Sequence, residues 1–499
     1  MFKRLGICLI VLILGILLYD SGMRERKAVQ EVEALNSLKV DSGGAGLLIR
    51  GFRGLAADAV FLKCVNLQDE KRYEDIPVLA GWLISLQPDF KEAVTYWASN
   101  LAWNISAVHG DYELRWQWVR HGIELLKDKA IPAYNAPEYH LEMARIYFMR
   151  IGEIIERADV VFKTKLLVLM SGILGKWDMT NLASAASDVY DMNEVLGDGR
   201  FEMIMEAHST DEEALYNVFK EFRRIDLSNV SEFEKEVIEL YLRRRLLFDE
   251  TGIDAVVAAD VNEIYGELDW RLADSLAVYW AHTGRERALE LEVNPYRYES
   301  MLMRALLRVL QNGTLFYLNE GYELQTSPNF EVVDYLDGLF PVMSRQYKRS
   351  EKAIKNNHRN FLLAAISLFY AYGEESRAKD YFIRFRQFFP EEAKSYSLNE
   401  LALSGLSGAG SSHDYRSVQT LISGLYRRMF EYLGTGEPEK ARALEQTAAK
   451  AWKSYKLNVD VADYEKGKLP PLRSIRSSVY ESLKGDLPQS LIERIKKMK

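Results

Sequence analysis

The residue types that most often carry chemistry are sparse here and do not form known catalytic or metal-binding motifs. The 499 residues include seven histidines, and no two lie three or four positions apart, so no helix presents a histidine pair to a metal ion. The two cysteines, Cys8 and Cys64, provide neither a cysteine-ligated metal site nor a disulfide framework. We therefore expect no enzyme, no cofactor and no metal, and we expect Cys64 to be a buried thiol on an apolar helix face.

Two groups of carboxylates are candidate general acids. Glu138 and Glu142 lie four positions apart on one helix face, where carboxylates are usually solvated. Glu299 followed by Ser300 resembles the catalytic Glu-Ser pair of lytic transglycosylases, in which the glutamic acid protonates a glycosidic oxygen. The Gly-Leu-Met-Gln that follows in that family is absent here. A peptidoglycan-cleaving enzyme that uses Glu299 is therefore the third of three functional hypotheses.

Aromatic side chains supply the candidate binding residue. Trp97, Trp103, Trp116 and Trp118 lie within 22 positions, and Trp116 shares its helix face with apolar residues, which is typical of packing between helices. Trp118 lies two residues further on and points elsewhere, so an exposed Trp118 could stack on sugar rings or anchor a peptide. The basic run 243–245 is interpreted as a solvated face with its aliphatic stems packed beneath.

The composition indicates that helices must position these residues. Hydrophobic types make up 48% of the chain and charged types 27%, which fits a globular protein and excludes disordered, collagenous and multi-span membrane classes. There are only 31 glycines and 12 prolines, so chain breakers are few. The net charge of −8 leaves no basic excess to neutralise phosphates, which argues against a nucleic-acid partner.

The N-terminus predicts a membrane segment. Lys3 and Arg4 precede an uncharged run over residues 5–19, which is short for a hydrocarbon core of about 30 Å. The run fits a signal-peptide core or a short anchor, and because small residues are poorly placed for cleavage we favour an uncleaved signal anchor. The expected location is the cytoplasmic membrane, as a single-pass protein with the bulk of the chain on the extracytoplasmic, periplasmic side. A cytoplasmic anchored protein is the alternative.

Apolar residues recur at helical spacing in segment after segment from Leu47 onward. One of the predicted helices covers residues 179–195. Two apolar-aromatic runs near residues 314–325 predict a small β-hairpin, and Ser407–Ser412 predicts a joint. The expected organisation is a signal anchor at 1–27, a flexible joint at 28–46, a helical-repeat region at 47–312, a β-hairpin insertion at 313–328, a repeat unit at 329–406 and a C-terminal helical block at 407–499.

One stretch carries a specific repeat pattern. Phe369, Gly373, Ala378, Phe382 and Pro390 follow one another at intervals of about four, five, four and eight residues. This spacing resembles the tetratricopeptide repeat, a helical hairpin in which glycine allows a tight turn, alanine allows close helix contact, the second aromatic fills the gap to the next unit and proline stops the second helix.

Two further segments match the pattern in part. Tyr432, Gly436 and Ala441 repeat the first three positions, and an earlier unit ends at Pro88 with Lys71 where the turn glycine would stand. The segments Leu268–Leu272 and Tyr279–Ala281 also resemble segments of membrane-anchored bacterial helical-repeat proteins. The resemblance implies an all-α, TPR-like α-solenoid of stacked helical hairpins with one N-terminal transmembrane helix.

The leading functional hypothesis is a membrane-anchored scaffold that binds protein partners during assembly of a cell-envelope complex, because stacked helical hairpins form grooves that bind peptides or domains. The alternative is a glycan-binding or polysaccharide-binding protein that uses exposed aromatics such as Trp118.

Overall fold

The structure, a computed structural model, describes residues 44–153, 158–225, 227–318, 324–402, 415–458, 469–486 and 489–498. Helices make up about 80% of it, which confirms the predicted all-α class. Among the described residues no helix is long and apolar enough to span a membrane. The predicted anchor at residues 5–19, the predicted joint Ser407–Ser412 and Cys8 lie outside the described residues.

The described residues form two compact units that interleave along the sequence. The first combines the chain up to Ile146 with Trp280–Tyr298, and the second combines Tyr147–Tyr279 with the chain from Glu299 onward. The predicted division into consecutive blocks at 47–312, 313–328, 329–406 and 407–499 therefore does not match the units. The physical reason is that residues Trp280–Tyr298, which end one long helix and begin the next, pack with the first unit, while the rest of both helices belongs to the second.

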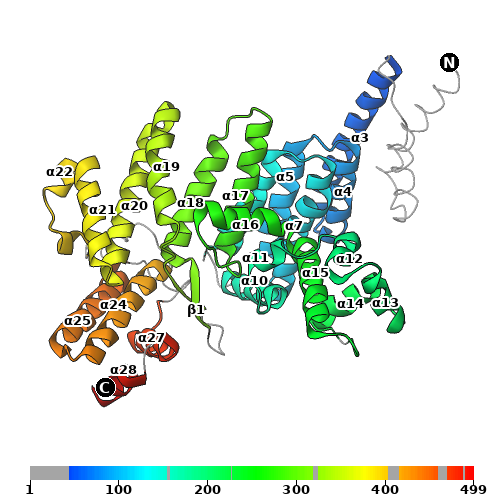
Figure 1. Cartoon of the computed structure of the whole chain (residues 1–499). Helices are drawn as coiled ribbons and strands as arrows, with labels where there is room; N and C mark the ends of the chain where they lie inside the picture. The colour runs from blue at the N-terminus through cyan, green and yellow to red at the C-terminus, as the bar shows by residue number, and fades with distance from the viewer. Residues whose placement is uncertain are drawn as a thin grey trace. The chain divides into compact units, whose positions relative to one another are not determined.

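The first unit is built from helices that follow one another with short connections (Figure 1). Many of their apolar residues are buried between neighbouring helices, and Trp97 and Leu101 have no exposed surface. In order they are α3 (Gly44–Asp69), η1 (Tyr73–Asp75), α4 (Ile76–Leu86), α5 (Lys91–Asn100), the π-helical η2 (Leu101–Ile105), α6 (Ser106–Val108), α7 (Tyr112–Glu124), the π-helical η3 (Leu125–Ala130), α8 (Ile131–Ala133) and α9 (Pro137–Arg145). The unit also includes the end of α17 (Ala273–Glu290) and the start of α18 (Tyr296–Asn312).

The second unit contains the remaining helices and both strands (Figure 1). Its elements before the strands are most of the π-helical η4 (Ile146–Ile151), then α10 (Ala158–Leu174), α11 (Met179–Ala183), α12 (Val189–Leu196), α13 (Arg200–Ala207), α14 (Glu212–Phe222), α15 (Glu232–Thr251) and α16 (Ala255–Tyr265), followed by the first part of α17 and most of α18. Its elements after α18 are β1 (Thr314–Leu318), β2 (Leu324–Ser327), α19 (Val333–Gln346), η5 (Lys348–Ser350), α20 (Glu351–Ala371), α21 (Glu375–Phe388), α22 (Pro390–Ala393), α24 (Tyr415–Thr435), α25 (Pro438–Asn458), α27 (Leu472–Asp486) and α28 (Gln489–Met498).

Local sequence explains where several helices begin and end. Ser231 and Glu234 form a capping box at the start of α15, where each side chain accepts a hydrogen bond from the other residue's backbone N–H. The helix ends at Gly252, which has φ +73°, a left-handed conformation that costs glycine little. A second capping box, Asp178 with Asn181, starts α11.

Helix prediction failed in one segment of the second unit. The single helix predicted for residues 179–195 is two helices, α11 and α12. The reason is local, because the Asp188 side chain accepts a hydrogen bond from the Asp191 backbone N–H and so starts a new helix. Residues 44–46 of the predicted flexible joint are likewise the first residues of α3.

The predicted β-hairpin is present. Strands β1 and β2 pair antiparallel, from Thr314 opposite Ser327 to Leu318 opposite Leu324, with an irregularity between Leu315 and Tyr317. β2 packs against α24 in the same unit.

Three pairs of adjacent helices form hairpins with a shared turn conformation. The residue in the turn has positive φ in each: Lys71 at +59° between α3 and η1–α4, Gly373 at +87° between α20 and α21, and Gly436 at +86° between α24 and α25. In each case the two helices pack together. Lys71 therefore adopts the left-handed conformation at the position where the repeat pattern has a glycine.

Candidate functional site

Most residues of the repeat pattern lie in the core between helices. Phe369 and Ala378 are fully buried, and Ala441 is nearly so. Phe369 stacks on Phe330 with ring centroids 4.7 Å apart. Tyr432 is half-buried, and its hydroxyl accepts a hydrogen bond of 3.1 Å from Arg428 Nη2.

One position of the pattern, Phe382, differs from expectation. Phe382 is only half-buried, with the guanidinium of Arg386 5.0 Å from its ring centre, whereas Tyr381 and Phe385 are the buried aromatics of α21. The helix turns its Tyr381 side toward α20, so Phe382 does not fill the gap predicted for it. Pro390 follows the end of α21 and is itself the first residue of the short helix α22.

Trp118 is buried, with 4% of its surface exposed, so the exposure that a role in ligand contact requires is absent. The His109 ring stacks on the indole with centroids 5.7 Å apart and planes 5° apart, and His121 and Tyr73 contact it edge-on. The physical reason is that α7 is covered on more than one side. Two tryptophans two residues apart are therefore both buried. Trp118 consequently gives no support to the glycan-binding alternative.

The carboxylates considered for catalysis occupy structural positions. Glu299 lies on α18 and is 7% exposed. Glu142 is buried as well, contrary to the expectation of a solvated face, and burial raises its pKa although Arg145 Nη1 lies 3.0 Å away. Glu138 pairs with Lys91. Within the part of the chain that the structure describes, no cluster of three or more potential metal-ligating side chains is present.

The arginine run on α15 is not a solvated face, because its charged heads as well as its stems are packed. Arg243 is 6% exposed and donates to the Gly172 and Ile173 carbonyls near the end of α10, at 3.0 and 2.5 Å. Arg244 donates to the Ala185 carbonyl. Arg245 lies over the Tyr216 ring, 3.9 Å from its centre.

Cys64 is buried as predicted, with no exposed surface. Burial raises the pKa of its thiol to about 12, so the reactive thiolate is disfavoured.

A strongly acidic surface in the second unit was missed from the sequence. Residues 188–239 contain fifteen acidic and five basic residues, so this segment alone is more acidic than the whole chain, whose net charge is −8. The segment covers α12, α13, α14 and the start of α15, and these helices contact one another. The signal was present in the sequence as a charge asymmetry along the chain.

Large apolar side chains are exposed on the same helices. Tyr190 is 72% exposed, Met203 59%, Phe222 54% and Phe233 60%. On α14, Ala214, Val218 and Phe222 recur every four residues and are all exposed, so they lie along one face of the helix. We call these three residues the α14 stripe. The neighbouring face of α14 is buried in the core through Leu215, Tyr216 and Phe219.

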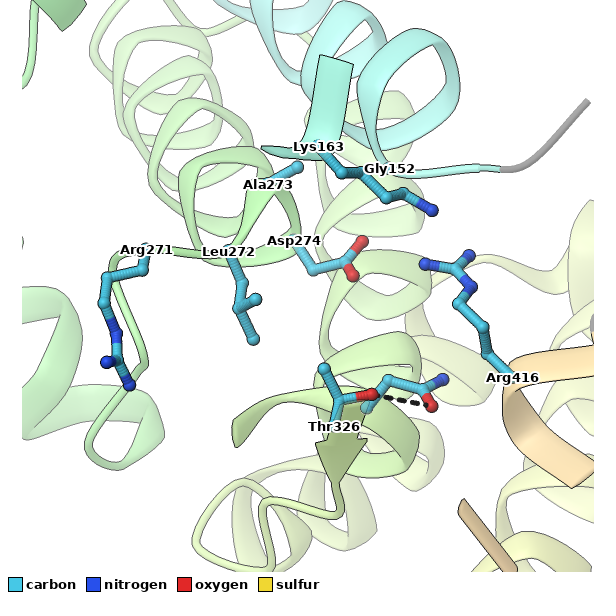
Figure 2. Close-up of a pocket in the computed structure, with 9 residues that line it drawn as sticks. Gly152, Lys163, Arg271, Leu272, Ala273, Asp274, Thr326 and Arg416 are labelled. Atoms are coloured by element: carbon cyan, nitrogen blue, oxygen red, sulfur yellow. Dashed lines mark hydrogen bonds between the residues drawn. The ribbon is translucent and has the colours of Figure 1, made fainter. Parts of the chain in front are cut away.

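A small polar pocket lies elsewhere in the second unit (Figure 2). Its cavity volume is about 20 Å³, which is room for about one or two water molecules. Figure 2 shows the side chains of Lys163 and Arg416 extending toward the carboxylate of Asp274. The lining residues are Gly152, Lys163, Arg271, Leu272, Ala273, Asp274, Asn312, Thr326 and Arg416, contributed by six separate places in the chain.

Arg271 and Asp274 each form an ion pair with a residue outside the pocket lining. Arg271 donates to both oxygens of Asp269 at 2.7 Å, and these hydrogen bonds raise the pKa of Arg271. Asp274 is 5% exposed, and its Oδ1 lies 3.4 Å from Arg308 Nη1. Arg308 is held in turn by the Phe148 carbonyl, at 2.7 Å.

Asn312 forms a polar part of the pocket wall. It is 2% exposed, and its Oδ1 accepts hydrogen bonds from Thr420 Oγ1 at 2.8 Å and Thr326 Oγ1 at 3.4 Å. Its Nδ2 is buried and has no acceptor among the described residues.

When the chain was compared with protein families, with curated proteins and with solved structures, no match was found.

Proposed function

We propose that this protein is a membrane-anchored helical-repeat scaffold that binds a protein partner during assembly of a cell-envelope complex. The observation that carries the proposal is the α14 stripe, an exposed apolar helix face within the most acidic segment of the chain. Exposed apolar surface bordered by polar residues is typical of protein-binding sites. The α-solenoid architecture and attachment to the membrane through residues 5–19 belong to the same proposal.

The helical hairpins support the repeat architecture. The turns at Lys71, Gly373 and Gly436 share a left-handed residue, and two of the hairpins contact each other through α20 and α24. Hairpins stacked in this way bury one helix face and leave others for partners. Catalysis is not part of the proposal, since the carboxylate that prompted the lytic-enzyme hypothesis, Glu299, does not line the pocket described above.

The chemistry of the surface specifies the kind of partner. Apolar side chains at i, i+4 and i+8 on α14 complement the apolar face of another amphipathic helix. Exposed carboxylates border the stripe, among them Glu213 and Glu221 on α14 itself. We therefore propose a partner with a basic amphipathic helix, whose lysines and arginines face these carboxylates. Electrostatic attraction of this kind is weakened by salt.

The test is purification of the full-length chain in mild detergent from its native membrane, followed by mass spectrometry. The Val218→Asp/Phe222→Asp variant places two charges in the stripe, and Ile383→Asp is the matched control because Ile383 is equally exposed on α21. We expect a stoichiometric protein partner with the wild type and the control, its loss in the double variant, and its elution as salt is raised. Retention of every partner by the double variant, or no stoichiometric partner with the wild type, would contradict the proposal.

A further inference from the structure

We propose that His208 is a proton-operated clip that holds the loop after α14 and regulates docking at the α14 stripe, a regulation that rests on the proposed function. The ring bridges two backbone carbonyls: Nδ1 lies 2.8 Å from the Ile204 oxygen and Nε2 lies 2.9 Å from the Ser228 oxygen. A carbonyl only accepts hydrogen bonds, and a neutral imidazole carries a single N–H. The imidazolium donates to both oxygens at once, so the bridge is complete only when the ring is protonated.

The surroundings of the ring favour a cation. Ile204 lies in the last turn of α13, where the helix carbonyls carry a partial negative charge. His208 is the only histidine in residues 188–239, where fifteen acidic residues face five basic ones in number. Among the described residues it has no ion-pair partner, so the two carbonyls and the Ser228 hydroxyl, at 3.5 Å, are its polar contacts. The charged residues of the three segments that meet at the ring, which are α13, residues 209–211 and the loop 223–231, are Arg200, Glu202, Glu206, Asp211, Arg223, Arg224 and Asp226.

The clip joins the two connections that flank α14. His208 precedes the helix and Ser228 follows it, so their hydrogen bond closes the chain around α14. The loop that is held in this way also reaches the stripe, because the guanidinium of Arg224 lies 5.7 Å from the ring centre of Phe222. The position of the loop therefore affects one end of the stripe.

α14 itself is fixed independently of the clip. Its Tyr216 hydroxyl donates a hydrogen bond of 2.6 Å to Asp249 on α15. Loss of the ring proton should therefore release the loop and leave the helix in place. Protonation adds a positive charge to the acidic segment and keeps Arg224 at Phe222, and both effects oppose a basic partner. We expect weaker docking of a basic helix at pH 6 than at pH 8, a range in which histidine is the side chain that ordinarily changes charge.

Hydrogen exchange of the full-length chain in mild detergent tests the clip. After correction for the intrinsic pH dependence of exchange, we expect the amides of Leu227–Val230 to exchange at least threefold faster at pH 8 than at pH 6, with no such change in α20 and α21. His208→Gln should abolish the difference. His121→Gln is the matched control, since His121 is a partly exposed histidine of the first unit, and it should behave as the wild type. Equal exchange at both pH values in the wild type, or a difference that persists in His208→Gln, would overturn the proposal.

A fluorescent synthetic amphipathic helix of leucine and lysine tests the regulation. The Val218→Asp/Phe222→Asp variant supplies the background from detergent, and binding above that background is specific to the stripe. We expect this binding to be at least threefold weaker at pH 6 than at pH 8 in the wild type, independent of pH in His208→Gln, and less dependent on pH in Arg224→Gln. Binding that does not vary with pH in the wild type would overturn the regulation. Absence of stripe-specific binding at both pH values would contradict the proposed function and the regulation together, whereas the exchange experiment decides separately whether the clip exists.

Discussion

Individual polar residues in this protein hold helices together from buried positions. His140 is 7% exposed, and its ring nitrogens lie 3.1 Å from Thr283 Oγ1 and 2.5 Å from Asn135 Oδ1. Arg287 Nε donates to the Asn135 carbonyl at 2.9 Å, so α9 is tied to the end of α17 within the first unit. Asn135 and Arg287 are 152 positions apart in the sequence, and nothing in their spacing predicts this contact.

Burial of His140 predicts that acid destabilises the first unit. Burial, followed by the charge of Arg287, lowers the pKa of His140 from 6.5 to about 4. Between pH 6.5 and pH 4 the unfolded chain therefore binds a proton that the folded chain does not. The free energy of unfolding keeps its full value above pH 6.5 and falls as the pH drops toward 4. At about 1.4 kcal/mol per pKa unit the loss is roughly 3 kcal/mol. Denaturant unfolding followed by tryptophan fluorescence between pH 7 and pH 4 measures it.

The control for this prediction separates the titration from the hydrogen bond. His140→Gln should reduce the pH dependence in this range by about half, because burial also lowers the pKa of His358 to about 4. Thr283→Val should lower stability equally at every pH and leave the slope unchanged. A wild-type stability that does not vary between pH 6.5 and pH 4 would contradict the prediction.

At the scale of elements, the turns of the helical hairpins are the positions where backbone conformation decides which residue is tolerated. A left-handed conformation costs a residue with a Cβ about 1–2 kcal/mol but costs glycine little. Gly373 has no close neighbour that a Cβ would meet, since the nearest atom is Arg428 Cδ at 3.8 Å. Strain at this turn is therefore a property of the backbone alone.

This reasoning predicts opposite effects at two turns. Lys71→Gly should raise the free energy of unfolding by about 1 kcal/mol, because it removes the strain at φ +59°, and Gly373→Ala should lower it by about 1 kcal/mol. Gly338→Ala is the matched control in the interior of α19, where a Cβ meets open space, and should stabilise by about 0.5–1 kcal/mol. Thermal unfolding checks all three, and destabilisation by Lys71→Gly would show that the turn does not hold the lysine under strain.

At the scale of the whole molecule, the two units share helices rather than follow one another. Residues 280–298 belong with the first unit although more than a hundred residues of the second unit precede them. Gly284 is a close packing point in the first unit, because a Cβ there would lie 3.0 Å from His140 Cβ and 3.1 Å from Tyr298 Cδ1. This position therefore tests the assignment of the segment.

Gly284→Leu should loosen the first unit selectively. We expect hydrogen exchange of the full-length chain to accelerate at least tenfold in α5 and α9, and to remain unchanged in α20 and α21. Gly338→Leu, at an open position of the second unit, should leave α5 and α9 unaffected. Equal acceleration in both units on Gly284→Leu would contradict the assignment.

The sequence by itself determined the helical class, the small β-hairpin, the buried Cys64 and the helices α20, α21, α24 and α25 of the repeat-like pattern. These follow from local periods of apolar residues and from turn-forming residues, which act over a few neighbouring positions. Only the tertiary structure decided that Trp118 and Arg243 are buried, that residues 280–298 complete the first unit, and that Lys163, Asn312 and Arg416 share a pocket. Burial and convergence depend on which helices pack together across long stretches of chain, and a single helix's periodicity cannot specify its partner.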